Sequence, residues 1–594
     1  MSTNTTLENQ QLSKVFISLI ALVQGLLLAL LYHRLEVELW PFGHFSFIHA
    51  FATILLFTPT LFLLVSTRQN WKKALLVTLP YCLLLATIAA YVGSLIIYHY
   101  SDQLTFVFTL CALISTFKVT LYTVNYANGT PFSYASLFHL SFRYFILATA
   151  TVLFSAILFT ILFLGAELFE VLGISIFSEL LADKWVWVPT LTLSVALAIN
   201  VFRSILHTVD VSASIVQTLF KFLLPFLVII SLGFAATLPF TGLQKLWDTG
   251  SGTSLVLWLQ ALTLFFVNAV YHEGNLHRPY KALMHRLIML GLVLLPIYSI
   301  IGAYGLWLRI DQYGLTVSRA WATVVCALLA CFAFGYLLGI IRLGERWQAA
   351  QSKINVGMGI VVAVGLLLIN TPFINFYSLS ASSQLARLDD GKVSLEEFDF
   401  DYFVYSLHAP GKEALDALKA DIAESNPDIV ALIDKKYSNR TRYSGGSELD
   451  DLQVETIVSF FPEKSSISSE FMDYLQASNI LNDSYPSSIV SLHIIAIDMD
   501  EDGSDEYLVV HAYNWGESAA LYSRMADDND AEKKQDEASK EQASENLWQR
   551  HYVNVSSDSR NAELSIILNS EKITLEERKW KKARIGPFEF IVQD

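Results

Sequence analysis

Eleven long apolar runs dominate the first 380 residues and constrain the fold more than any other feature of the chain. A helix needs about 20 mostly apolar residues to cross the hydrocarbon core of a bilayer. Each run is close to that length and carries few charges, so the sequence predicts an α-helical polytopic membrane bundle. The predicted spans are residues 13–33, 45–66, 74–98, 104–124, 143–165, 186–205, 213–236, 254–272, 284–306, 319–341 and 355–375.

Charge divides the chain into two physically different parts. Residues 381–594 contain 42 acidic and 21 basic side chains, whereas residues 1–380 contain 13 acidic and 19 basic ones. A mean hydropathy of +0.44 is too high for an ordinary soluble enzyme. We therefore predict a transmembrane domain over 1–380 and a soluble domain over 381–594. The acidic part would repel phosphate, so no nucleic-acid partner is expected.

Positive charges alternate between the connecting loops, which predicts the orientation. Short loops rich in Lys and Arg stay in the cytoplasm. The N-terminus and every second loop hold most of these charges. This places the N-terminus in the cytoplasm and, after an odd number of spans, the C-terminal domain in the periplasm. The inner segments carry Lys14, Arg68, Lys72, Lys73, Arg143, Arg203, Arg278, Lys281, Arg286, Arg342, Arg346 and Lys353, against Arg34, Lys184, Lys245, Arg309 and Arg319 in the others.

The polar domain begins with helical patterns and continues with strand-like ones. PGKEALDALKADIAE, NPDIVALIDKKY and SEFMDYLQASNIL have the apolar spacing of helices. From Ser487 onward, six short runs predict strands, so the domain is expected to be α+β. Residues 525–546 have almost no apolar side chains and predict a charged flexible insertion.

The stretch IDMDEDGSDEYLVV predicts a calcium-binding turn. Three aspartates alternate before a glycine, and a glutamate follows just before an apolar strand. Carboxylates at this spacing converge on one point. An EF-hand requires Glu at the twelfth place, where Val509 stands, so the loop is not an EF-hand. It resembles the D-x-D-x-D-G-x-x-D/E turn of integrin-type β-propeller repeats, which implies as ligands Asp498, Asp500, Asp502, Glu506 and the carbonyl of Ser504.

The acidic turn also has an alternative explanation that needs no metal ion. A solvated hairpin turn explains the acidic residues without calcium, because Asp and Gly are common in turns. If calcium binds, its expected role is structural.

Glu36 and Glu38 resemble the acidic pair in the first outer loop of lipid-linked-sugar transferases, although this loop has only about ten residues. No nucleophile elbow, Walker loop, dinucleotide fingerprint or C-x-x-C motif occurs, so we favour a function without catalysis.

Polar side chains inside the predicted spans are candidates for a transport path. Such residues are costly in lipid and usually serve function. Long amines near a membrane surface can also snorkel to the interface, and this is the alternative for the two lysines. The candidates are Lys118, Asn200, Lys221, Gln260 and Asn268.

The segment YGLWLRIDQYGLTVSRAW, from Tyr304 to Trp321, is similar to a motif of bacterial membrane proteins of the family domain of unknown function 4153. The preceding VNAVY and the later SQLARL, GKV and FDFDYF match the same family. The resemblance covers residues 10 to 420 and extends to the acidic turn. It implies a bacterial inner-membrane protein but neither an activity nor catalytic residues.

Within this motif, QYGLT predicts a tight turn between the ninth and tenth spans. Gly314 permits the turn, and Thr316 or Ser318 can cap the tenth helix. We interpret the segment as a structural turn rather than a binding site. The charged residues expected to pair there are Arg309, Asp311 and Arg319.

Two functions follow from these features. A transporter or flippase would move a small molecule or lipid along a polar path, and the many spans favour it. A sensor or envelope scaffold would act through a calcium-binding periplasmic domain and a periplasmic partner, and the acidic domain favours it. Membrane lipids are expected partners in both cases. We favour transport, with a lipid-linked-sugar-type transferase as a third reading.

Overall fold

The computed structural model divides the chain into two compact units, residues 1–97 with 101–430, and residues 98–100 with 431–594. The first unit therefore ends at residue 430 and includes polar helices that follow the last span. The boundary predicted at residue 380 marks only the end of the apolar spans. The described residues are 12–37, 39–97, 102–130, 132–205, 210–248, 251–272, 279–444, 458–462, 467–477, 489–499, 503–513, 516–524, 548–557, 574–576, 582–585 and 588–592.

The first unit is helical, and eleven of its described helices are long and apolar enough to cross a membrane, as the sequence predicts. Their large apolar side chains are widely exposed, which suits contact with lipid. The helices are α2 (Lys14–Glu36), α3 (Phe45–Val65), α4 (Trp71–Ser94), α5 (Asp102–Asn128), α6 (Tyr134–Val171), α7 (Ile176–Ala182), α8 (Lys184–Ile205), α9 (Asp210–Thr241), α10 (Gln244–Asp248), α11 (Gly252–Val270), α12 (Ala282–Tyr313), α13 (Val317–Leu343), α14 (Gln348–Leu368), α15 (Phe376–Asp389) and α16 (His408–Ile422).

The predicted limits were least accurate for the fifth span. The sequence predicts 143–165, but α6 has 38 residues and runs from Tyr134 to Val171. At 1.5 Å per residue this helix is about 57 Å long, well beyond a hydrocarbon core of about 30 Å. An apolar run marks only the part of a helix that suits lipid. The helix itself continues through the polar residues on either side and ends in turns that reach water.

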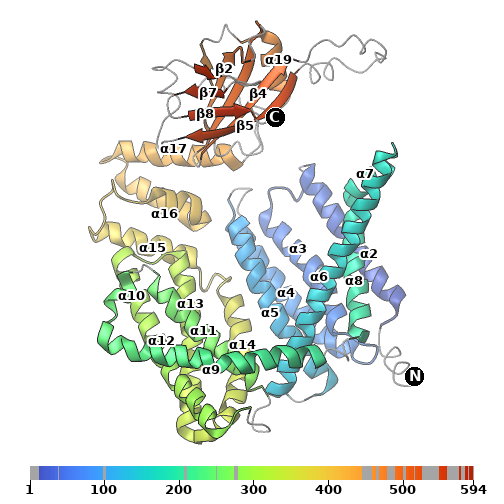
Figure 1. Ribbon diagram of the computed structural model, residues 1–594, viewed down its shortest axis with the longest axis vertical. Coiled ribbons are helices and arrows are strands. Elements are labelled where there is room, and N and C mark those ends of the chain that lie inside the picture. Colours follow the sequence, from blue (N-terminus) through green and yellow to red (C-terminus); the bar gives the residue numbers. More distant parts are fainter. Residues whose placement is uncertain are drawn as a thin grey trace. The chain divides into compact units, whose positions relative to one another are not determined.

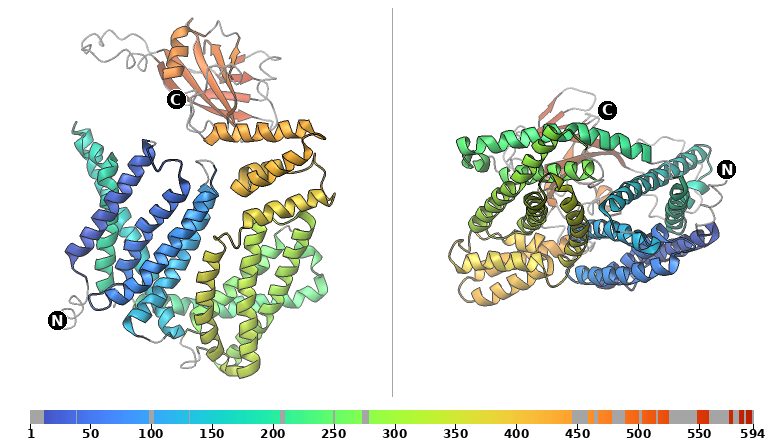
Figure 2. Two further views of the ribbon diagram at one scale, coloured as in Figure 1. Left: turned by 180° about the vertical axis from the view of Figure 1, so that it is seen from behind. Right: turned by 90° about the horizontal axis from the view of Figure 1, so that it is seen from below.

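The helices of the first unit form two groups, which Figure 1 colours blue to teal and green to olive. In the first group α3 packs on α4, and α2 and α6 pack on α8. In the second, α12 packs on α11 and α13, and α9 runs across α11 and α12 in Figures 1 and 2. We call the contact of α14 with α5 and α6 the seam, because it joins the groups. There the Ser115 hydroxyl donates to the Ala363 carbonyl at 3.2 Å, and the Tyr122 hydroxyl donates to the Val356 carbonyl at 2.5 Å.

The second unit is α+β, as predicted. Its described strands form one eight-stranded sheet in the order β1-β2-β3-β4-β5-β8-β7-β6, antiparallel except for the β1–β2 pair. Phe471 of α19 stacks on Tyr507 with ring centroids 4.2 Å apart and covers one face of the sheet. The elements are α17 (Pro427–Ser444), which crosses the boundary between the units, β1 (Val458–Phe461), α19 (Ser469–Ala477), β2 (Ile489–Ile497), β3 (Glu506–Tyr513), β4 (Gly516–Arg524), β5 (Trp548–Ser557), β6 (Thr574–Glu576), β7 (Lys582–Ile585) and β8 (Phe588–Val592).

Most of the elements predicted for residues 381–594 are confirmed. The three predicted helices are α16, α17 and α19, and five predicted strands are β2, β3, β4, β5 and β8. The short strands β1, β6 and β7 were not predicted, because three or four residues carry too little periodicity. The predicted strand ELSIIL and the predicted insertion at 525–546 lie outside the described residues.

Candidate functional site

A cavity of about 220 Å³, partly open to its surroundings, lies at the seam between the two helix groups. We call it the seam cavity. Two of the five predicted path residues line it, namely Lys118 and Asn268. The full lining comes from α5 (Lys118, Leu121, Tyr122), α6 (Tyr134, Leu137, Phe138, Ser141), α11 (Phe265, Asn268, Ala269), α13 (Phe332) and α14 (Asn355, Met358, Gly359, Val362).

Chain connectivity explains why these residues meet at one end of the bundle. Residues 129–133 join the end of α5 to the start of α6, and a 3₁₀ turn at Gly344–Arg346 joins α13 to α14. Asn268 lies two residues before the end of α11, which leads into α12 at the same end. The C-terminal halves of α5 and α11 and the N-terminal halves of α6 and α14 therefore contribute the polar lining.

Lys118 lies deep in its helix. It is ten residues before the end of α5, or about 15 Å along the axis, close to the middle of this 27-residue helix. Its side chain lines the cavity, and no described residue forms a hydrogen bond or an ion pair with its ammonium group. An unpaired ammonium at this depth is costly in lipid, which makes Lys118 a functional candidate rather than a packing residue. The depth also weighs against the alternative of simple snorkelling.

Asn268 is the centre of a buried polar cluster beside the cavity. Its Oδ1 accepts hydrogen bonds from the Tyr336 hydroxyl at 2.6 Å, from Asn355 Nδ2 at 2.8 Å and from Gln351 Nε2 at 2.9 Å. The Tyr134 hydroxyl donates to its backbone carbonyl at 2.9 Å. The cluster spans α6, α11, α13 and α14, so it fixes the Asn268 amide across the seam.

The remaining path residues do not line this cavity. Gln260 is fully buried within the second group, where its Nε2 donates to Ser299 Oγ at 2.7 Å. Asn200 lies beside Arg203, whose guanidinium caps the end of α3 through the Leu63 carbonyl at 2.7 Å. Lys221 is exposed on α9. The five residues therefore do not form one continuous path in this conformation.

The cluster contains residues that the sequence did not single out. Tyr336 lies within a predicted span and Asn355 begins one, so their polarity was the only signal available, whereas Tyr134 and Gln351 lie before the predicted spans and gave none. Tyrosine is common near membrane interfaces, so it did not stand out. Which of these residues meet depends on the spatial order of the helices, which a single sequence does not give.

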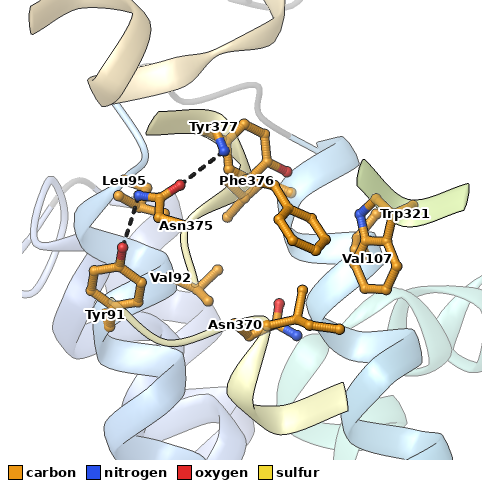
Figure 3. Close-up of a pocket in the computed structure, with 11 residues that line it drawn as sticks. Tyr91, Val92, Leu95, Val107, Trp321, Asn370, Asn375, Phe376 and Tyr377 are labelled. Carbon is orange, nitrogen blue, oxygen red and sulfur yellow. Dashed lines mark hydrogen bonds between the residues drawn. The ribbon is translucent and has the colours of Figure 1, made fainter. Parts of the chain in front are cut away.

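A second, smaller pocket at the other end of the first unit is a structural joint (Figure 3). Its volume of about 20 Å³ suits a single water molecule. Asn375 Nδ2 donates to the Tyr91 hydroxyl at 2.9 Å, and Asn375 Oδ1 caps α15 by accepting from the Tyr377 amide at 2.9 Å. Burial raises the pKa of Tyr377 to about 12, so its hydroxyl stays protonated. The pocket is too small for an organic substrate.

The acidic turn is described only in part. Asp500 and Asp502 lie outside the described residues, so the predicted ligand set is untested. Asp498 Oδ2 accepts from the Gly503 amide at 3.1 Å, and Glu506 Oε2 accepts from the Met499 amide at 2.6 Å. Ser504 follows Gly503 in the turn. The other Asp498 oxygen, Oδ1, is buried and has no described hydrogen-bond partner. An orphaned carboxylate oxygen fits a cation ligand.

Glu36, at the end of α2, and His272, after α11, are engaged in local contacts. Lys184 forms an ion pair with Glu36, and Glu38 lies outside the described residues. His272 stacks on Phe138 with centroids 4.5 Å apart. Within the described ranges, no group of three or more metal-ligating side chains occurs.

The family motifs meet in one joint between α15 and the turn after α12. The last carbonyls of a helix have no partners within it. Arg387 Nη1 donates to the Gln312 carbonyl at 2.6 Å, and Gln384 Nε2 donates to the Tyr313 carbonyl at 3.0 Å. Gly314 follows with φ +74°, which confirms the predicted tight turn. The motifs RIDQYGLT and SQLARL therefore belong together because side chains of the second satisfy backbone groups of the first.

The start of α13 completes this joint. Thr316 caps the helix by accepting from the Arg319 amide at 3.4 Å, as predicted. The Val317 amide donates to the Tyr402 hydroxyl at 3.0 Å. Among the described residues, no ion pair joins Arg309, Asp311 and Arg319, which were predicted to pair here. Arg319 Nη1 instead donates to the Gly314 carbonyl at 2.7 Å.

These features define a polytopic helical membrane protein with an additional α+β unit. A family model, Domain of unknown function (DUF4153), matches residues 104–418, which is more than half of the chain, so the chain belongs to that family. The match includes the helices that line the seam cavity and the α15 joint, and it ends before the acidic turn. No curated protein and no solved structure matches the chain.

Proposed function

We propose that the protein transports or flips a small molecule or lipid across the bacterial inner membrane, with the seam cavity as its substrate site. The observation that carries the proposal is the Lys118 ammonium, which lies inside this cavity without a described partner. A lysine retained only for packing would be expected to pair with a carboxylate or reach the interface.

The position of the cavity supports the same function. Substrate sites of transporters lie where two helix groups meet, because movement of one group against the other opens the site to either side. Among the described residues, few side-chain hydrogen bonds cross the seam, and they involve single hydroxyls, such as those of Ser115 and Tyr122. Such a contact can separate at modest cost.

The orientation is part of the proposal. The alternation of positive charges supports a cytoplasmic N-terminus, a cavity near the cytoplasmic end of the bundle and a periplasmic second unit. A cysteine at Ser504, in the exposed acidic turn, tests this in spheroplasts with intact inner membranes. An impermeant thiol reagent is expected to label it, and protection until the membrane is opened would reverse the orientation.

A translocation assay tests the function. Full-length protein is reconstituted in vesicles with a fluorescent phospholipid, and an impermeant quencher reports arrival at the outer leaflet, with and without a proton gradient. Ser141→Trp fills the cavity, and Val152→Trp places the same side chain on the exposed face of the same helix. Wild type and Val152→Trp are expected to accelerate translocation and Ser141→Trp to abolish it. Equal rates with wild type, with Ser141→Trp and without protein would overturn the proposal.

A second candidate is a sensor or scaffold that acts through a calcium-locked hairpin in the second unit. The buried Asp498 Oδ1 supports it, because an unpaired carboxylate oxygen at this position is costly unless a cation binds there. The residues that would hold the ion are Asp498, Asp500, Asp502, Glu506 and the Ser504 carbonyl. The ion would join the ends of β2 and β3 and stiffen the turn.

A further inference from the structure

The geometry points to a more specific substrate class for the seam cavity: an amphiphile with a phosphate or similar anionic group that pairs with Lys118. This inference rests on the proposed function, because it names what the same cavity holds. It depends on the charge of the lining, its free hydrogen-bond donors and its apolar rim.

The charge of the lining is of one sign. Lys118 is the only side chain of the described lining that is charged at neutral pH, and the lining contains no Asp or Glu. An anion is therefore attracted without opposition, whereas a cation would meet an uncompensated ammonium in a medium of low dielectric constant. Lysine binds phosphate as a point charge, which suits a headgroup that enters at varying angles.

The depth of Lys118 makes a ligand the natural counterion. About 15 Å of helix separates it from the end of α5, and none of the other four helices around the cavity supplies a carboxylate there. A charge at this depth is stabilised only by an opposite charge, by water or by polar groups in the cavity. An anionic headgroup provides both the charge and the hydrogen-bond acceptors.

Asn268 provides an oriented donor. Its Oδ1 accepts from the side-chain amides of Gln351 and Asn355, and the Tyr336 hydroxyl shares its one proton between Asn268 and Asn355, so the amide is held in one orientation. Its Nδ2 has no hydrogen-bond partner among the described residues. Asn268 lines the cavity together with Lys118. A phosphate oxygen can therefore accept from a fixed amide and from an ammonium, and bonds to an anionic oxygen are stronger than neutral ones.

The rim explains why the ligand is an amphiphile rather than a free anion. Phe138, Phe265 and Phe332 line the cavity, and Phe265 is 55% exposed at its edge. The volume of about 220 Å³ is enough for a headgroup but not for a whole lipid. An apolar chain would therefore leave past these rings into the bilayer.

Native mass spectrometry of the full-length protein tests the inference. The protein is delipidated in mild detergent and titrated with phosphatidylglycerol, with zwitterionic phosphatidylethanolamine and with glycerol 3-phosphate. Lys118→Gln removes the charge, Lys118→Arg keeps it, and Lys221→Gln removes a lysine outside the cavity as a matched control. If Lys118→Gln still binds phosphatidylethanolamine, this variant is folded, and loss of its anion preference cannot be attributed to misfolding.

Phosphatidylglycerol, which has a net negative charge, is expected to bind at least about tenfold more tightly than zwitterionic phosphatidylethanolamine. Lys118→Gln should remove this preference, while Lys118→Arg and Lys221→Gln should keep it. Glycerol 3-phosphate is expected to bind more weakly. If it binds as tightly as the lipid, the source of the anion is a soluble phosphate, and the assignment of an amphiphile is overturned.

Equal binding of the two lipids, or a preference that survives Lys118→Gln, would overturn the inference. The translocation assay is independent of this result. Lipid movement that is blocked by Ser141→Trp without any anion preference would sustain the proposed function and refute only the substrate class. A preference for the anionic lipid without lipid movement would support the binding of an anionic amphiphile and refute the proposed transport.

Discussion

Lys118 and Gly359 shape the seam cavity in opposite ways, one by the charge it brings and the other by the side chain it lacks. A Cβ at Gly359 would overlap the Tyr122 hydroxyl, which donates across the seam to the Val356 carbonyl. The glycine therefore lets α14 approach α5 closely while Tyr122 keeps its hydrogen bond. The seam therefore depends on a glycine that faces a tyrosine, and a larger residue at position 359 should disturb the packing there.

Gly359→Ala is expected to destabilise the protein by about 1–3 kcal/mol through overpacking against Tyr122. The same substitution in a Tyr122→Phe background should cost little, because the atom that is overlapped is gone. Thermal unfolding in detergent of the two single variants and the double variant measures this coupling. Gly357→Ala is the matched control on the same helix, where a Cβ meets no neighbouring atom. Additive effects of the first two substitutions would contradict the geometry.

Calcium is expected to stabilise the second unit through Asp498. At a concentration about one hundred times the dissociation constant, a bound ion adds about 2.7 kcal/mol to the free energy of unfolding. Intrinsic tryptophan fluorescence follows unfolding, and Trp548, which packs in the core of the sheet against Phe471, is one of the contributing residues in the second unit. Chelator should reverse the shift, Asp498→Asn should remove it, and Asp505→Asn, an exposed neighbour outside the ligand set, should retain it. If calcium leaves the melting temperature unchanged, the prediction of a metal site is wrong.

The residues of the cavity could be predicted only in part. Lys118 and Asn268 stand out because each is a polar side chain in an apolar run. Gln260 stands out equally, yet it does not line the cavity, and its amide nitrogen donates inside one helix group to Ser299 and to the Leu329 carbonyl. Polarity identifies residues that need a partner, but only the spatial order of the helices decides whether that partner is another side chain or a ligand.

At the scale of elements, apolar run length predicted the eleven spans well and their ends poorly. The joint between α15 and the turn after α12 could not be predicted, although both of its motifs were noticed. Their contact joins residues about 70 positions apart, such as Gln384 and Tyr313. A helix end with free carbonyls needs donors, but nothing in a single sequence says which later segment supplies them.

Tyr402→Phe is expected to loosen one specific bond of this joint. The Val317 amide loses its acceptor, so its hydrogen exchange should accelerate. The Leu315 amide, which donates to Ser383 Oγ at 2.9 Å, should keep its protection. Ser383→Ala is expected to give the opposite pattern. Hydrogen exchange resolved to these amides by mass spectrometry or NMR distinguishes the two, and identical patterns in both variants would mean that the joint opens as a whole.

At the scale of the whole molecule, the two helix groups and the cavity between them carry the functional account. The region matched by the family model contains all five cavity-lining helices and the α15 joint, but not the acidic turn. A function common to the family is therefore expected to reside in the helical unit. The second unit, with its candidate calcium turn, would then modify or connect that function.

The most direct test of transport through the seam does not require a known substrate. A cysteine replaces Ser141 in a variant whose four native cysteines are alanine, and an impermeant thiol reagent is applied to either side of reconstituted vesicles. Val152→Cys, on the exposed face of the same helix, is the control that should stay unlabelled. Transport predicts that the cysteine at position 141 is labelled from both sides, because the seam opens to each in turn. Labelling from one side only would contradict it and favour a bundle that anchors the second unit.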